Sequence, residues 1–446
     1  MIVELARQAV KMAMVQGAAA AECTAVEGDE FSVTVRMGEV ESIKESGARG
    51  TGIRVLVNKN AGSSYTSDLS EQGIHAMVTR ALELARVTTA DPHAGMPEPD
   101  ELGKLNGSLD LYHADIATLK AEEKVDLARR AEKAALDADP RITNSDGGSF
   151  GSHTSLHAFA NSLGFEGEYR TSSCSLSAVP VAREGESMER DYWYTAARSF
   201  ARLESPEQIG RIAAERVLRR LNPRKVPTCK VPVVFEHRAA RSLVGHVYEA
   251  VHGESVYRKA SFLAGKLGQQ VASENVTIVD DSTIPGLFGT SPFDDEGVPS
   301  RRTVVVERGV LRSYLLNTYT GRKLGMKTTG NASRGLSGNI GIGHGNLYLE
   351  NGHATNADLF AAAGSGLYVT ELIGHGFNAV TGDYSIGATG LWIENGALAY
   401  PVSEVTIAAN LRDMLMGIQL VAGDLEFRGS VASPSILIRE MTVSGQ

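Results

Sequence analysis

The chain has 446 residues, of which 44 are Lys or Arg and 53 are Asp or Glu, so its formal net charge at pH 7 is −9. With 42% hydrophobic and 22% charged residues it has the composition of a soluble globular protein, which excludes global disorder. The acidic balance argues against a broad nucleic-acid-binding surface, and no apolar run is long enough to predict a transmembrane helix.

The N-terminus and the cysteines indicate a cytoplasmic protein. Residues 1–17 place acidic and basic residues among apolar ones at helical spacing, which is typical of an amphipathic helix and not of a signal peptide. Cys23, Cys174 and Cys229 lie far apart and form no CxxC pair. They predict neither a disulfide framework nor a zinc finger, so we expect a reducing compartment and no contact with a membrane.

Residues 1–90 predict an N-terminal α+β domain. After the opening helix, apolar residues alternate from Phe31 to Met37, which predicts a strand, and the region around Ile53 predicts another. Ser70 is placed to cap a second helix with an apolar stripe. Three prolines among acidic residues then predict a linker over residues 91–115.

Residues 116–226 predict a middle α+β domain. A helix is expected over about 117–138 and is ended by Pro140. The residues after it predict a turn at 144–148, a hairpin at 161–164 and several short strands.

A further helix in this domain is predicted from its start signal, Ser205 followed by Pro206 and, at the third position, Gln208. Its end is basic. We interpret that end as a solvated terminus that complements the helix dipole, in preference to an anion site. The basic residues are Arg216, Arg219, Arg220, Arg224 and Lys225.

Residues 227–446 predict a mainly β C-terminal domain. Strand patterns dominate there, and helices are expected only near 237–252, 356–363 and 408–416. Glycine makes up 47 of the 446 residues, and much of the excess falls in 325–396, which indicates tight turns and bulges between strands. The expected fold class is therefore α+β, with N-terminal α+β units followed by a mainly β, glycine-rich C-terminal domain.

His246, Glu249 and His252 share one predicted helix and raise the question of a metal site. Zinc peptidases of the His-Glu-x-x-His type place two imidazoles one turn apart on one helix face. Here the spacing is His-x-x-Glu-x-x-His, so the two imidazoles are separated by about 240° around the helix. One straight helix cannot direct both at the same ion, and a polar helix face or an interface is the preferred interpretation.

No other motif predicts catalysis. The glycine run 330–345 matches neither GxGxxG nor the P-loop and lacks their strand–turn–helix context, so we interpret it as a flexible or peptide-facing loop. No G-x-S-x-G elbow occurs, and no charge pattern near a cysteine favours a thiolate.

Several longer motifs, in order along the chain, resemble the TldD/PmbA family, and in particular its TldE (PmbA) branch. The resemblance extends over essentially the whole chain. The motifs are residues 141–144, 188–192, 256–263, 292–298, 370–372, 381–385, 392–396 and 400–402.

This resemblance implies a subunit of a cytoplasmic heterodimeric metallopeptidase that acts on unfolded peptides. In the family, the TldD-type subunit carries a His-Glu-x-x-x-His motif and a later cysteine as its metal site. The three motif positions correspond here to Gly245, His246 and Ala250, and no cysteine follows Cys229, so none occurs around 426–433. The resemblance therefore implies no catalytic residue, metal or cofactor in this chain, with zinc expected in a TldD-type partner.

The leading hypothesis is a non-catalytic TldE/PmbA-type subunit that helps to form a peptide-holding cavity, and that forms a homodimer when the partner is absent. Glycine-rich loops at 330–345 and 374–390 would suit a peptide held as an added strand. Arg258 and Glu371 lie inside family motifs and are candidates for substrate or partner contact.

Two alternatives remain open. One is a self-sufficient peptidase with a displaced metal site built from His246, Glu249 and His252 or His375. The other is a protein-binding regulator of a DNA topoisomerase, because the family has also carried the label "modulator of DNA gyrase". The acidic charge argues against direct contact with DNA but not against contact with a protein.

Overall fold

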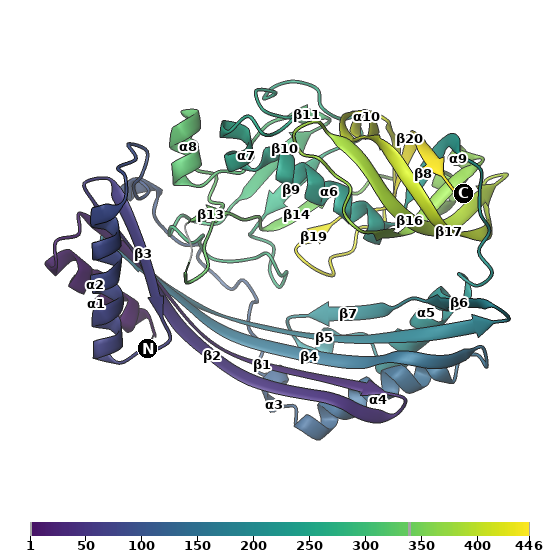
Figure 1. Cartoon of the computed structure of the whole chain (residues 1–446), viewed down its shortest axis with the longest axis horizontal. Helices are drawn as coiled ribbons and strands as arrows, with labels where there is room; N and C mark the ends of the chain where they lie inside the picture. Colours follow the sequence, from purple (N-terminus) through teal and green to yellow (C-terminus); the bar gives the residue numbers. More distant parts are fainter. Residues whose placement is uncertain (1, 338–339, 446) are drawn as a thin grey trace.

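The computed structural model describes residues 2–337 and 340–445, which form two lobes (Figure 1). The N-terminal lobe is a long, curved antiparallel sheet with helices on its outer face. The C-terminal lobe, built from shorter strands, lies over the inner, concave face of that sheet. The predicted α+β class, with a mainly β C-terminal part, is confirmed.

One seven-stranded sheet runs through the N-terminal lobe. β1 pairs with β4 from Glu22 opposite Asn161 to Val35 opposite Gly148, so the segments 1–90 and 116–226 contribute to the same sheet. Their division into separate domains stays a prediction. The strands in spatial order are β3 (Asn60–Thr66), β2 (Glu39–Val57), β1 (Ala20–Arg36), β4 (Ile142–Asn161) and β5 (Glu166–Glu184), with β6 (Ser187–Arg190) and β7 (Trp193–Ala197) both paired to β5.

Helices cover the outer face of this sheet in two groups. α1 (Ile2–Val15) and α2 (Glu71–Val87) pack at the end near β3, and α4 (Ala121–Leu136) and α5 (Pro206–Leu218) pack on β4 and β5. They pack there because each helix carries a stripe of apolar residues that the sheet buries. The two predicted N-caps are confirmed, since the side chains of Ser70 and Ser205 accept hydrogen bonds from backbone N–H groups three residues on.

The segment 91–115 runs along the C-terminal lobe. Arg322 donates a hydrogen bond to the carbonyl of Met96 at 2.7 Å, and Gly103 N donates to the carbonyl of Gly297 at 3.0 Å. The segment and its flanks contain the short elements η1 (Pro99–Glu101) and α3 (Asp115–Thr118), and η2 (Phe200–Arg202) follows β7.

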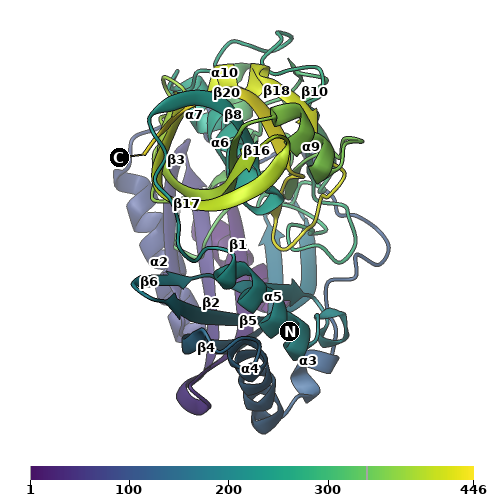
Figure 2. The same ribbon diagram turned by 90° about the vertical axis from the view of Figure 1, so that its right-hand side faces the viewer.

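The C-terminal lobe contains a small barrel, visible as a ring in Figure 2. Five strands close into the barrel because the first in spatial order, β17, pairs with the last, β20. A sixth strand, β18 (Ile418–Val421), pairs with β20 outside this ring. The five strands in order are β17 (Ala397–Asn410), β16 (Asp383–Glu394), β15 (Gly366–Ile373), β8 (Cys229–Phe235) and β20 (Ile436–Ser444).

A second, five-stranded sheet lies beside the barrel, and α6 (His237–Val251) contacts strands of both. This helix carries the candidate site. The sheet contains β11 (Val310–Leu311), β10 (Arg302–Glu307), β9 (Ile278–Asp281), β14 (Asn346–Leu349) and β19 (Val431–Ala432). The remaining elements are α7 (Gly253–Tyr257), α8 (Thr318–Leu324), the pair β12 (Ala332–Ser333) and β13 (Gly341–Ile342), α9 (Asn356–Ala363) and α10 (Leu411–Met416).

None of the helices within 2–337 and 340–445 is both long and apolar enough to cross a bilayer.

Candidate functional site

One face of α6 lines a cavity of about 420 Å³ between the two lobes, here called the α6 pocket. Residues of β15 and of the loop after it form the opposite wall, and Asp191 and Tyr192 of the N-terminal lobe close it on a third side. The polar side chains in this pocket include Arg238, Arg241, His246, Glu249, Glu371 and His375.

His246 is held in the pocket by its neighbours. Its Nδ1 lies 3.3 Å from Glu249 Oε1, and its ring packs on Phe377 with the centroids 4.4 Å apart. Burial lowers the pKa of His246, and Glu249 acts in the opposite direction. His246, Glu249 and His375 thus line the same pocket.

His252 does not join them. It follows the last residue of α6, and its ring packs against Tyr248 with the centroids 5.6 Å apart. Tyr248 in turn packs against His344, whose ring centroid is 4.8 Å away. His252 therefore lies on another side of the helix from His246, in agreement with the angular separation expected from the sequence.

The side chains at the positions that the resemblance assigns to zinc do not fit that ion. Gly245 brings no side chain to the pocket, Ala250 is fully buried, and His246 is already engaged with Glu249. Across the described ranges, no three His, Cys, Asp or Glu side chains are grouped as a metal site would need. Two arginines of α6 that line the same pocket, Arg238 and Arg241, add positive charge where a divalent cation would bind.

The basic end of α5 is only in part the solvated terminus that the sequence predicts: Arg224 and Lys225 are exposed, but for Arg216 and Arg220 that interpretation is wrong. The Arg216 side chain is 6% exposed and pairs with two buried carboxylates, Asp191 at 3.4 Å and Glu236 at 3.0 Å. Arg220 pairs with Glu371 at 2.5 Å. Because these carboxylates come from both lobes, the arginines of α5 connect the lobes.

The two predicted contact candidates lie in different places. Glu371 lines the α6 pocket, where its partner is Arg220. Arg258 follows α7, is 61% exposed at its side chain, and pairs with Glu254 at 2.6 Å. Their contact with a substrate or a partner stays a prediction.

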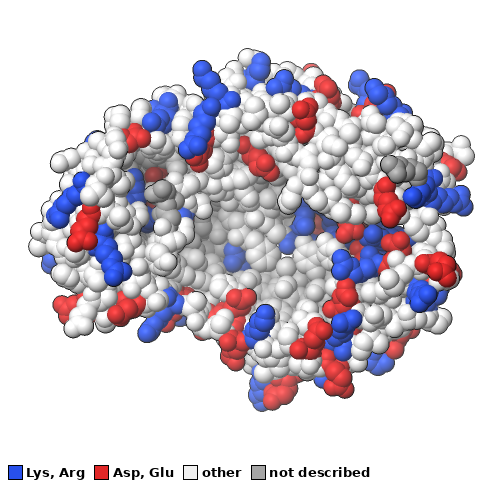
Figure 3. All heavy atoms as spheres, in the orientation of Figure 1, with Lys and Arg blue, Asp and Glu red and all other residues white. Residues whose placement is uncertain are grey.

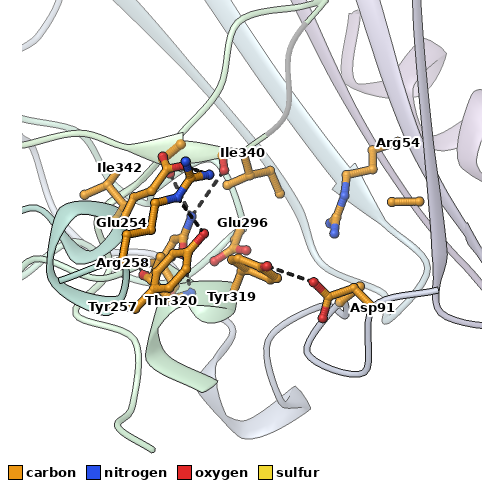
Figure 4. Close-up of a pocket in the computed structure, with 14 residues that line it drawn as sticks. Arg54, Asp91, Glu254, Tyr257, Arg258, Glu296, Tyr319, Thr320, Ile340 and Ile342 are labelled. Carbon is orange, nitrogen blue, oxygen red and sulfur yellow. Dashed lines mark hydrogen bonds and ion pairs between the residues drawn. The ribbon is translucent and has the colours of Figure 1, made fainter. Parts of the chain in front are cut away.

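Arg258 lines a second cavity of about 490 Å³, which lies between β2 and β3 of the first sheet and α7 and α8 (Figure 4). On its far side Tyr319 donates a hydrogen bond to Asp91 at 2.8 Å. Glu296 lies at its base and accepts hydrogen bonds from the backbone N and the Oγ1 of Thr318. Burial, reinforced by nearby Glu22, raises the pKa of Glu296 to about 7.

The first part of the glycine run 330–345 packs on the N-terminal sheet. Arg334 contacts Glu22 and Thr24 of β1, and the backbone of Leu336 passes directly over Gly52 of β2. Arg334 therefore anchors this part to the sheet through a buried contact, while Ser333, Gly335 and Ser337 are exposed, and its contact with a peptide stays a prediction. Residues 338 and 339 of the predicted loop lie outside the described residues.

Sequence reasoning missed Arg238 and Arg241, which face the α6 pocket together with Gly245 and Glu249. The signal was present in their spacing, since residues three or four apart share one helix face. Tyr192, from a loop more than forty residues earlier, carried no such signal.

Three family models match successive parts of the chain: PmbA/TldA metallopeptidase domain 1 over residues 21–85, the central domain over 114–221 and the C-terminal domain over 228–445. The chain is 42% identical to the metalloprotease PmbA of Escherichia coli O157:H7, over 93% of this chain and 90% of that protein. It is 39% identical to the PmbA homolog of Haemophilus influenzae, over 98% and 96%.

The fold also matches a solved structure. TldE from Thermococcus kodakarensis superimposes with a TM-score of 0.86 over 99% of both chains, at 22% sequence identity. This likeness shows that the two-lobed architecture is shared.

Proposed function

The chain belongs to the TldD/PmbA family of metallopeptidases, in its PmbA (TldE) branch, and on that basis we propose that it is the non-catalytic subunit of a heterodimeric TldD/TldE zinc peptidase acting on unfolded peptides. One observation carries the proposal. Gly245 and Ala250 stand where the resemblance puts the two histidine ligands, and the two arginines of α6 that line the α6 pocket disfavour a divalent cation. The zinc, and the water it activates, would belong to a TldD-type partner in the cytoplasm.

The hollow between the lobes supports a peptide-holding role (Figure 3). A cavity of about 470 Å³ lies against the concave face of the first sheet, where Ser32 and Ser175 line the sheet side and Phe288 and Arg428 line it from the C-terminal lobe. Small polar side chains leave room for a main chain without selecting particular residues. An extended peptide bound by main-chain hydrogen bonds would therefore be accepted with little sequence preference.

The strand β7 offers an edge for such a peptide. Among the described strands it pairs only with β5, and Figure 1 draws it facing the C-terminal lobe. An unpaired strand edge presents N–H and C=O groups that an extended peptide can use, and in β7 the carbonyl of Tyr194 is already taken by a hydrogen bond from Arg428.

The test is cleavage of an unstructured reporter peptide by this chain alone, by a TldD-type partner alone, and by their mixture. We expect cleavage by the mixture, sensitive to a chelator, and none by this chain alone. Purified chain that carries stoichiometric zinc and cleaves the peptide by itself would refute the proposal.

A double variant, His246→Ala with Glu249→Gln, separates this proposal from the displaced-site hypothesis. Both side chains line the α6 pocket, so a metal held there would be lost. A non-catalytic subunit with this change would still support cleavage by the mixture. Size measurement of the isolated chain would show in addition whether it forms a homodimer.

A further inference from the structure

We propose that the α6 pocket is a carboxylate-binding site, in which Arg238 and Arg241 hold a carboxylate of an unfolded peptide. The inference deepens the proposed function. It rests on that function in one respect, namely that the carboxylate comes from a peptide. The carboxylate belongs either to the C-terminus of the peptide or to an acidic side chain.

The two arginines reach one cavity because of their spacing. Arg238 and Arg241 are three residues apart on α6, and Gly245 and Glu249 continue the same face toward the other end of the helix. Gly245 leaves open space there, since a Cβ at that position would meet nothing within 4 Å. This face of α6 therefore carries the two guanidinium groups at one end and, next to them at Gly245, space that no side chain fills.

Every carboxylate that lines the pocket already has a partner. Glu371 pairs with Arg220 at 2.5 Å, Asp191 with Arg216 at 3.4 Å, and Glu249 with His246 at 3.3 Å. The first two pairs neutralise their carboxylates, whereas His246, whose pKa is lowered by burial, gives Glu249 a hydrogen-bond partner. None of them neutralises the two arginines of α6.

Arg238 and Arg241 have no carboxylate within 4 Å in the part of the chain that the structure describes. Nε and Nη1 of Arg238 are buried without a hydrogen-bond acceptor among the described residues, and Arg241 donates only to the hydroxyl of Tyr194, at 3.2 Å. A guanidinium removed from water without a counter-ion is unfavourable, so an anion entering the pocket would stabilise it.

Aromatic rings hold Arg238 in position. Its guanidinium lies over the rings of Tyr192 and Trp193, at 4.5 and 5.1 Å from their centroids. Both rings come from the N-terminal lobe, so the cation is fixed by the contact between the lobes. A planar guanidinium that is positioned in advance suits a planar carboxylate.

The walls favour an organic anion over a free inorganic one. Leu372, Ile386 and Ala239 line the pocket beside the arginines, and a cavity of about 420 Å³ is much larger than a carboxylate alone. The remaining volume can hold the apolar part of a peptide residue.

The position of β7 connects this pocket to the hollow between the lobes. Tyr192, directly before β7, lines the α6 pocket, and Ala196, within β7, lines the cavity on the concave face of the sheet. Four residues of extended chain cover about 13 Å. A peptide that lies along β7 and displaces Arg428 from the carbonyl of Tyr194 would thus extend from one cavity into the other and bring a carboxylate to Arg238 and Arg241.

The experiment measures binding of labelled unstructured peptides to the isolated chain, and needs no catalytic partner. Three peptides share a neutral sequence and differ in one group: a C-terminal carboxylate, a C-terminal amide, and a C-terminal amide with one internal glutamate. The proteins are the unmodified chain, Arg241→Gln, Arg238→Gln and Arg241→Lys. Arg308→Gln, at a side chain that is 78% exposed, is the matched control.

We expect at least one carboxylate peptide to bind at least about tenfold more tightly than the uncharged amide, and each glutamine variant to remove that difference. Arg241→Lys should retain part of it, because the charge stays while the planar group is lost. Preference for the C-terminal acid or for the internal glutamate identifies the source of the carboxylate. Equal affinity for all three peptides, or inorganic phosphate binding as tightly as the acidic peptides, would overturn the inference.

This result is independent of the proposed function. If the chain proves to be a zinc peptidase by itself, the proposed function fails while the carboxylate preference can still be measured with a chelator present. If the carboxylate preference is absent but the mixture with a TldD-type partner cleaves peptides, only this inference fails.

Discussion

Arg334 donates a hydrogen bond to Glu22 at 3.0 Å, and the two side chains are only 3% and 1% exposed. The residues are 312 positions apart in the sequence, one in the C-terminal lobe and one in β1 of the N-terminal sheet. Arg54 contacts the same carboxylate at 2.9 Å from β2. A buried carboxylate with two arginines thus joins the lobes at the end of the molecule opposite the α5 arginines.

Arg334→Ala is expected to destabilise the protein by about 3 kcal/mol, because it removes one of two cations from a buried carboxylate. The thermal unfolding midpoint should fall by several degrees. Arg308→Ala, at a side chain that is 78% exposed, is the control and should leave the midpoint nearly unchanged. Equal midpoints for the two variants would contradict a stabilising role for the Arg334 contact.

Gly52→Ala is expected to displace the segment around Leu336 from the sheet. A Cβ at Gly52 would lie 2.0 Å from the carbonyl oxygen of Leu336, so the two backbones cannot stay where they are. The expected loss is about 1–3 kcal/mol. Displacement should also make the peptide bond after Arg334 more accessible to trypsin, which limited proteolysis would detect.

Gly245→Ala is the matched control for that substitution. It lies in the helix α6, and an added Cβ would meet nothing within 4 Å. Replacing a helical glycine by alanine usually stabilises a protein by about 0.5–1 kcal/mol. Faster trypsin cleavage in this variant too would show that the effect of Gly52→Ala is not specific to its contact.

Arg216→Ala should be among the most destabilising substitutions in the chain, by about 3–5 kcal/mol. It leaves Asp191 and Glu236 buried in the contact between the lobes without their main cation. Arg219→Ala, at the residue directly after α5, is the control, since that side chain is 32% exposed and reaches Glu236 only at 3.7 Å. In denaturant unfolding, the free energy of unfolding of Arg219→Ala should be close to that of the unmodified chain. A larger loss for Arg219→Ala than for Arg216→Ala would contradict the role given to Arg216.

Local features of the fold were predictable from the sequence, and the pairing of distant segments was not. Ser70 and Ser205 identify helix starts because a cap acts on residues only three positions away. The alternation of apolar and polar residues indicates that β1 is a strand. It does not indicate that β1 pairs with β4, which lies more than a hundred residues later. Family resemblance and the α+β class were confirmed because both rest on patterns within single segments.

The predicted turn at 144–148 shows how turn residues can mislead. These residues lie inside β4, where the register with β5 shifts between Ser145 and Gly148 and Gly147 has φ +114°. A bulge needs the same residues as a turn, so composition alone cannot separate them. The arginines of α5 were misread for a related reason, because the carboxylates that bury them come from distant segments.

Replacing Glu296 by glutamine should change how stability depends on pH. Its pKa is raised from 4.5 to about 7, chiefly by burial, so the folded protein holds this proton more tightly than the unfolded chain does. The contribution of that proton to stability is present below about pH 4.5 and is lost as the pH rises toward 7. Glu296→Gln cannot ionise, and its amide oxygen can still accept the hydrogen bonds from Thr318. Between about pH 5 and 8 the variant should therefore gain stability relative to the unmodified chain, by at most about 3 kcal/mol.

Unfolding midpoints of the unmodified chain and of Glu296→Gln across that pH range test this prediction. Glu274→Gln, at an 80% exposed side chain, is the control. Parallel pH curves for the unmodified chain and Glu296→Gln would mean that Glu296 is ionised in the folded protein throughout this range.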